Sequence, residues 1–308
     1  MSIAFFDFFD GSGFICNDID NTKAKWYNQC VIHFLKGVLK NMFKSLYRLH
    51  QNEGRLLPEA VLTGKGVFVM LLLFFVEQLA AEALALLVNL YELPLGVMEI
   101  NLIVNGGVLL LMLFFFGGFF WTNLKHFFKD FQMIYLWLPL ACYAGTMFLN
   151  VIVQMALALI RGEFQNTSNN ALIMELLYKY PIPLILLTVI IAPITEEAIF
   201  RAALSRSMTA SKKPWIKVMG FVLSIFFFAF FHVYQFVFFA LDAAGQTYLT
   251  FNANELLSIL VYLPMAAGLV ICSYFSKNFW CSVITHMLSN GIAVAMLLLL
   301  WLMAHLPQ

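Results

Sequence analysis

Seven apolar runs of about 20 residues or more constrain most strongly what this chain can fold into. An α-helix needs about 20 apolar residues to cross the hydrocarbon core of a bilayer, which is about 30 Å thick. Composition agrees, because 62% of the residues are hydrophobic and 11% are charged, against about 25% charged residues in soluble domains. We therefore predict an all-α, polytopic transmembrane helical bundle. The spans are expected at about 66–91, 98–121, 132–160, 181–204, 215–240, 256–275 and 279–304.

A basic amphipathic helix is expected before the first span, from Trp26 to about His50. Apolar residues such as Leu35 and Val38 form one stripe, and a basic residue recurs at every fourth position on another. These basic residues are Lys36, Lys40, Lys44 and Arg48. Such a helix is expected to lie on an anionic membrane surface. The alternative is a solvated helix that packs on the protein's own loops.

The basic residues also favour one orientation, because cytoplasmic loops are enriched in Lys and Arg. Fifteen of the 18 basic residues precede the first span or fall in alternate loops, whereas Arg161 and Lys179 fall in the remaining loops and Arg201 within a span. We expect a cytoplasmic N-terminus in a cell inner membrane or an ER-type membrane. The net charge of +1 gives no reason to expect a nucleic acid partner, so the lipid bilayer is the expected environment.

Three of the expected spans carry ionisable or polar residues at helical spacing. Such residues are costly at bilayer depth, at roughly 2.5–3.5 kcal/mol for a charged side chain, so they usually face a protein interior and mark function. They are Glu196, Glu197 and Arg201 in the fourth span, His232 in the fifth, where Phe228 lies four residues earlier, and His286 and Asn290 in the seventh.

Helical spacing suggests roles for the acids of the fourth span. Glu197 and Arg201 are four residues apart, with the acid first, which is the favourable order for an ion pair on a helix. Glu196 points about 100° away around the helix, so it is the less neutralised carboxylate and the candidate general base. Pro193, three residues earlier, is expected to open the helix locally.

The two histidine spans complete the candidate site. His286 and Asn290 lie four residues apart, so their side chains share a helical face and could stabilise an oxyanion. His232 could orient a water that Glu196 deprotonates, or bind a metal. For any one of these residues alone, a structural role between helices is the alternative.

Three other acids lie within or beside apolar stretches without an Arg or His at helical spacing. We expect structural or accessory roles for them. They are Glu77, Glu82 and Glu99.

In combination, the three motifs resemble those of a known family. The patterns beginning at Glu196, Phe228 and His286 are similar to the EExxxR, FxxxH and HxxxN motifs of the CAAX protease and bacteriocin-processing (CPBP, or Abi) intramembrane proteases, which include the Ras-converting enzyme. The resemblance covers roughly residues 181–304. It implies an intramembrane endopeptidase that cleaves a membrane-associated protein or peptide.

The resemblance also implies a role for each motif residue. Glu196 and His232 would activate a water, and His286 and Asn290 would stabilise the oxyanion. Supporting roles fall to Glu197, Arg201 and Phe228. No metal is favoured, although two His and one Glu would also suit zinc with an open position.

The resemblance divides the chain into three parts. Residues 1–60 form an N-terminal segment with the amphipathic helix, residues 61–180 form accessory transmembrane helices, and residues 181–308 form the catalytic core. Two other functions stay open, namely a proton- or cation-coupled transporter that uses the Pro193-interrupted span, and a non-catalytic immunity or scaffold member of the same family.

Counting along the helices gives an expected depth for the site. At 1.5 Å per residue, Glu196 lies about 15 Å from Arg206, and His286 about 13 Å from Lys277. His232 lies about 22 Å from the nearest basic residue, so the fifth helix must be tilted or begin beyond the membrane surface. We expect a site in the cytoplasmic half that is reached from the cytoplasmic side.

Overall fold

The computed structural model describes residues 43–164, 166–241 and 247–305 of the chain. Within these residues, seven helical segments are long and apolar enough to cross a membrane, which confirms the expected helical fold and an integral membrane protein. The segments are Gly64–Leu90 (α2), Val97–Lys129 (α3), Ile134–Arg161 (α4), Pro181–Thr209, Pro214–Phe231 (α9), Ala253–Ser276 and Phe279–Met303. The last lies within α13 (Phe279–His305), and the sixth combines α11 (Ala253–Leu257) with α12 (Ile259–Ser276).

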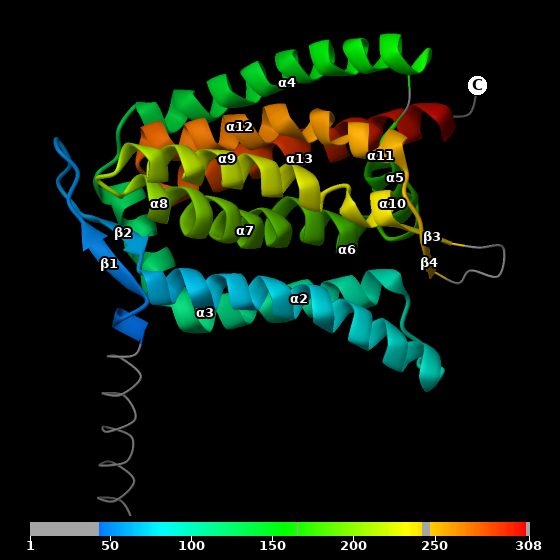
Figure 1. The fold of residues 1–308 in the computed structure, drawn as a ribbon, viewed down its shortest axis with the longest axis horizontal. Coiled ribbons are helices and arrows are strands. Elements are labelled where there is room, and N and C mark those ends of the chain that lie inside the picture. Colours follow the sequence, from blue (N-terminus) through cyan, green and yellow to red (C-terminus); the bar gives the residue numbers. More distant parts are fainter. Residues whose placement is uncertain (1–42, 165, 242–246, 306–308) are drawn as a thin grey trace, which may run out of the picture. The chain divides into compact units, whose positions relative to one another are not determined.

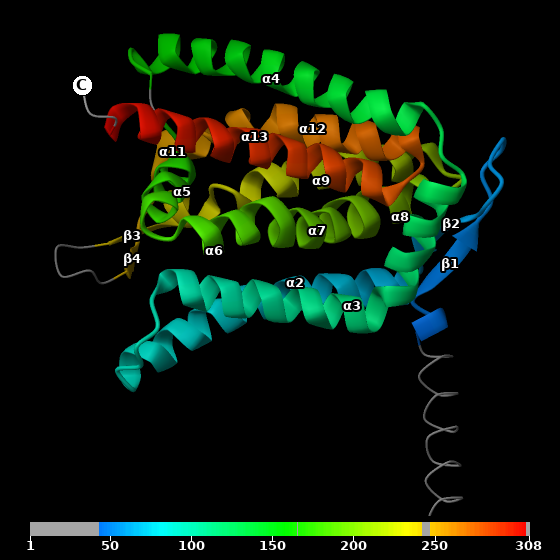
Figure 2. The same cartoon turned by 180° about the vertical axis from the view of Figure 1, so that it is seen from behind.

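The fourth span lies between two groups of helices (Figures 1 and 2). On one side α2 packs against α3, and on the other are α9, α12 and α13, with α4 packed outside α12. The approach of α12 to α4 is close at Gly268, where an added Cβ would lie 2.2 Å from the Cγ2 of Thr146. Small residues allow such close contacts between membrane helices.

Two π-helical segments interrupt the fourth span. It runs through α6 (Pro181–Ile185), η1 (Leu186–Ile191), α7 (Ala192–Glu196), η2 (Glu197–Arg206) and α8 (Ser207–Thr209), in which η1 and η2 are the π-helical segments. Pro193 sits between η1 and η2, and it has no N–H to donate to the preceding turn. Near this proline the helix is therefore opened in the form of π-helical turns. Such turns are frequent at functional sites.

The expected C-terminal end of the amphipathic helix is wrong. Residues 26–42 of that helix lie outside the described part of the chain, but Tyr47–His50 form a strand, β1, which pairs antiparallel with β2 (Glu59–Leu62). The pairing buries the whole of β2 and brings the carbonyl oxygen of Leu46 to the backbone N–H of Thr63, at 2.9 Å. These cross-strand hydrogen bonds and apolar contacts stabilise a strand here, although the four-residue repeat of basic side chains predicts a helix.

The fifth span ends earlier than its apolar run. It was expected at 215–240, but α9 stops at Phe231, and the chain turns through His232 into α10 (Tyr234–Phe238). A short hairpin of β3 (Phe239–Leu241) and β4 (Thr247–Leu249) follows. The apolar residues after the turn, including Val233 and Val237, are buried in the protein instead of continuing a span.

The loops that carry most of the basic residues gather at one end of the bundle (Figure 1). This basic end consists of the β1–β2 hairpin and the loops α3–α4, α8–α9 and α12–α13. Hydrogen bonds join these parts, since Asn278 donates to the carbonyl oxygen of Asn123 at 3.1 Å and Asn123 donates to that of Ala60 at 3.2 Å. Arg206 also pairs with the buried Glu59.

The opposite end of the bundle is built from α5 (Ser168–Lys179), α11 and the β3–β4 hairpin. Here Arg161, at the end of α4, donates to the hydroxyl of Ser258 at 3.0 Å. The two ends therefore carry alternate loops, as the distribution of Lys and Arg predicts. Their orientation in a membrane remains a prediction.

Candidate active site

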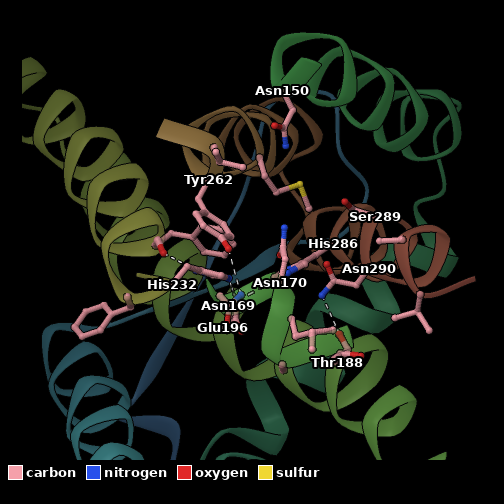
Figure 3. A pocket seen from close by; sticks show the side chains of 18 of the residues that line it. Asn150, Asn169, Asn170, Thr188, Glu196, His232, Tyr262, His286, Ser289 and Asn290 are labelled. Carbon is pink, nitrogen blue, oxygen red and sulfur yellow. Dashed lines mark hydrogen bonds and ion pairs between the residues drawn. The ribbon is translucent and has the colours of Figure 1, made fainter. Parts of the chain in front are cut away.

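Glu196, His232 and His286 come together although they belong to three different spans (Figure 3). The Oε2 atom of Glu196 lies 3.9 Å from Nε2 of His232 and 3.9 Å from Nε2 of His286. These distances are too long for direct hydrogen bonds and suit a bridging water. The meeting of the three groups follows from the packing of the fourth span against α9 and α13.

The ring of His232 is oriented by its own helix. It follows the last residue of α9, and its Nδ1 atom lies 2.7 Å from the carbonyl oxygen of Phe228. A carbonyl oxygen accepts only, so Nδ1 carries the proton, and Nε2 of the neutral ring presents a lone pair toward Glu196. Tyr262 packs beside the ring, with 4.7 Å between the ring centroids.

Glu197, Arg201 and His286 form a buried polar group behind Glu196. Arg201 Nε lies 3.2 Å from Glu197 Oε2, and both side chains are completely buried, so the predicted ion pair is confirmed. The other carboxylate oxygen of Glu197 lies 3.1 Å from Nδ1 of His286 and accepts a hydrogen bond from it. Removing one partner of such a buried pair costs about 3–5 kcal/mol.

Phe228 connects this group to His232. The guanidinium carbon of Arg201 lies 4.3 Å from the centroid of the Phe228 ring, which is within reach of a cation–π interaction. The same ring lies 4.5 Å from the ring of His232 and 5.6 Å from that of His286, measured between centroids. The aromatic residue of the FxxxH pattern thus contacts three of the predicted polar residues.

Asn290 contacts the π-helical segment of the fourth span. Its Nδ2 atom donates to the carbonyl oxygen of Thr188 at 2.9 Å, a bond that fixes the amide and leaves its second N–H available. Asn290 lies one helical turn after His286, and both side chains line one cavity.

The cavity has a volume of about 640 Å³ and is lined by residues of α2, α4, α5, α9, α12, α13 and the fourth span. Its lining reaches Asn169 of α5 and Leu300 of α13, toward the opposite end of the bundle. On the side of Glu196 toward the basic end, residues 198–203 are all buried, and of these Ile199 and Phe200 line the cavity. The side from which water and substrate reach the site stays a prediction.

The sequence reasoning missed several lining residues. Glu77 lies on the face of α2 that carries Met70, Leu73 and Phe74, and it lines the cavity together with Glu196. That spacing of three and four residues was the signal that could have found it. Polar residues of α4, α5 and α12 line the cavity as well, and no pattern within one helix marks them. They are Asn150, Gln154, Asn169, Asn170 and Tyr262.

Unlike Glu77, the acids Glu82 and Glu99 do not line the cavity. The carboxylate of Glu99 accepts a hydrogen bond from the N–H of Gly96 at 3.1 Å and so caps the start of α3, as a structural role requires. Glu82 is exposed on α2 and does not line the cavity.

A metal centre is not formed by the residues in place. Across the described part of the chain, no group of three or more His, Cys, Asp or Glu side chains is arranged to hold a metal ion. The two imidazoles and Glu196 do not meet the spacing of a zinc site in this arrangement.

Comparisons with known proteins identify the region that carries these residues. Residues 178–292 match the family described as type II CAAX prenyl endopeptidase Rce1-like, which confirms the family predicted from the three motifs. The matched region includes every one of the seven motif residues. Neither the curated proteins nor the solved structures contain a match to the chain.

Proposed function

Because residues 178–292 form an Rce1-like type II CAAX prenyl endopeptidase domain, a peptidase domain, we propose that the chain hydrolyses a peptide bond of a membrane-associated protein or peptide within the membrane. The observation that carries the proposal is the position of Glu196 Oε2, 3.9 Å from the Nε2 atoms of both His232 and His286 on one cavity. The substrate is a polypeptide, and no nucleic acid is involved.

In the proposed reaction Glu196 is the general base. A water between Glu196 and His232 directs one proton to the carboxylate and the other to the Nε2 lone pair of His232. A lone pair on its oxygen remains free to attack the carbonyl carbon. Glu196 takes the proton as the new C–O bond forms and later gives it to the leaving nitrogen. The C–N bond then breaks, which yields one new carboxyl and one new amino terminus.

The oxyanion formed in this step is stabilised from α13. Asn290 offers the N–H that does not bond to Thr188. His286 holds its Nδ1 proton against Glu197, so it can donate from Nε2 only as an imidazolium, and the buried carboxylate of Glu197 offsets that charge. Each oxyanion donor is worth about 10²–10³ in kcat.

The domain sits in the membrane with its basic end in the cytoplasm, which is the orientation that the distribution of Lys and Arg supports. The cavity then faces the half of the membrane away from the cytoplasm. A single cysteine replacing Lys212 or Glu163 in a cysteine-free chain tests this, because an impermeant thiol reagent should label intact cells at Glu163→Cys and not at Lys212→Cys.

The central test is hydrolysis by the purified chain in liposomes. We expect Glu196→Gln and His232→Ala each to abolish the release of new amino termini from membrane peptides. Glu82→Gln, an exposed acid on α2, should not change it. Unchanged hydrolysis in both site variants contradicts the mechanism. Ion flux that disappears in Glu196→Gln without any hydrolysis favours the transporter instead.

A further inference from the structure

The part of the cavity lining that comes from α4 and α5 is rich in side-chain amides. Asn150 of α4 and Asn169 and Asn170 of α5 are labelled in Figure 3, and Gln154 of α4 lines the cavity with them. We call these four residues the amide wall. They lie before residue 178 and so outside the matched domain, which carries all three motifs.

The amides are available for binding. Asn169 donates to the hydroxyl of Tyr262 at 3.3 Å, and Gln154 donates to Asn150 at 3.4 Å, which leaves the Nδ2 protons of Asn150 unused. The side chain of Asn170 makes no hydrogen bond to another described residue, and its backbone N–H is held by Thr167 at 3.2 Å. Polar groups kept beside a membrane cavity are costly unless they gain partners.

The size of the cavity limits what can occupy it. A cylinder with the diameter of an α-helix and its side chains occupies about 500 Å³ per turn. A cavity of about 640 Å³ therefore holds little more than one turn of a substrate helix. A scissile bond reaches Glu196 only if the substrate is extended there, and each backbone N–H and C=O released from a helix then needs a new partner.

Side-chain amides can supply the hydrogen-bond partners that an extended substrate backbone requires. Each amide offers both a donor and an acceptor, so it can bond to a peptide unit whatever the adjacent side chain is. The amide wall can thus replace the lost helical hydrogen bonds of an extended segment.

The charged side chains of the cavity lining also limit which part of a substrate can bind there. Two carboxylates, those of Glu77 and Glu196, line the cavity, and among the described residues no Lys or Arg does. Arg201 is fully buried and is paired with Glu197. A free terminal carboxylate close to the scissile bond would thus lie beside the carboxylate of Glu196 and would meet no Lys or Arg side chain among the described residues.

We infer that the amide wall binds the backbone of an extended, uncharged, internal segment of the substrate polypeptide, and that a free C-terminal carboxylate is not recognised. This inference rests on the proposed peptidase function and specifies its substrate class. It assigns recognition to α4 and α5 and chemistry to the fourth, fifth and seventh spans.

The position of the cut in a defined peptide tests the inference. One peptide of defined sequence with uncharged side chains is supplied in phosphatidylcholine liposomes as the free acid and as the C-terminal amide, and the products are sequenced. We expect internal cuts at the same bonds and at similar rates for the two forms. Cuts confined to the last three bonds of the free acid, at a rate at least tenfold above the amide form, would overturn the inference.

Substitutions in the amide wall provide the second measurement. Asn150→Leu and Asn170→Leu should each raise KM about three- to tenfold without lowering kcat, because each removes a hydrogen bond worth about 1 kcal/mol. The matched control is Asn105→Leu on α3, whose amide bonds to the carbonyl of Asn101 outside the cavity. An unchanged KM in both wall variants refutes the inference and leaves the peptidase proposal intact, whereas the absence of hydrolysis by the wild-type chain refutes the peptidase proposal itself.

Discussion

The Nδ1 atom of His286 lies 3.1 Å from a carboxylate oxygen of Glu197, and both side chains are buried. The other oxygen of that carboxylate pairs with Arg201. One acid therefore both orients an imidazole and compensates a buried guanidinium. The arrangement suggests that Glu197 acts on the site through His286, while the neighbouring Glu196 faces the cavity.

Removing either member of the Glu197–Arg201 pair should destabilise the fold more than removing both. We expect Glu197→Gln and Arg201→Met each to lose about 3–5 kcal/mol of unfolding free energy, because each leaves a buried group without its partner. The double variant should recover much of that loss. Reversible unfolding in detergent measures the three values, and losses that simply add would show that the two side chains are not coupled.

Asn290 should matter to the chemical step. Asn290→Leu is expected to lower kcat by about 10²–10³ with little change in KM, because the amide would act on the oxyanion and not on the bound substrate. Ser289→Ala, the adjacent residue of the same cavity, serves as the control. A change confined to KM would assign Asn290 to binding instead.

Phe228 should be required for full activity because it positions the site residues that its ring contacts. Phe228→Leu removes the ring that contacts Arg201, His232 and His286, so we expect a fall in kcat of about tenfold or more, from a misplacement of the site by a fraction of an ångström. Phe226→Leu changes an exposed ring of the same helix and should have little effect. Equal activity of the two variants would contradict the positioning role.

The hydrogen bonds at the basic end should hold α3 to the loop between α12 and α13. Asn278→Leu removes donors to the carbonyl of Asn123 and to the ring of His126, so we expect a loss of about 1–3 kcal/mol of stability. The melting temperature of the purified chain measures this, with Asn101→Leu, which loses a bond within its own helix, as the control. Activity at low temperature should persist, since Asn278 does not line the cavity.

The motif residues could be predicted because helical spacing alone brings each pair together. Glu197 and Arg201 meet across one turn, and His286 and Asn290 line the same cavity. The pattern did not show how three helices converge on Glu196. It also did not show that α9 ends at this point, because an apolar run does not reveal the turn at His232.

Glu77 and Asn170 show what the spacing within the three motifs cannot predict. They belong to helices that carry no motif, and they reach the cavity only because α2 and α5 pack beside the fourth span and α13. Which face of a helix turns inward depends on tertiary packing, and Asn170 has no apolar stripe to indicate it. The strand at Tyr47–His50 was missed because the four-residue repeat of basic side chains favours a helix and does not indicate the pairing with Glu59–Leu62.

The cavity draws its walls from two separate stretches of the chain, one before residue 178 and one that comprises the matched domain and the rest of α13. The residues that bind the substrate and the residues that hydrolyse it would then lie in separate parts of the sequence. An exchange of α4 and α5 with those of another chain of this fold could redirect the enzyme to a new polypeptide, while the groups that break the bond stay as they are. The same separation offers protein engineers a region to diversify without touching Glu196.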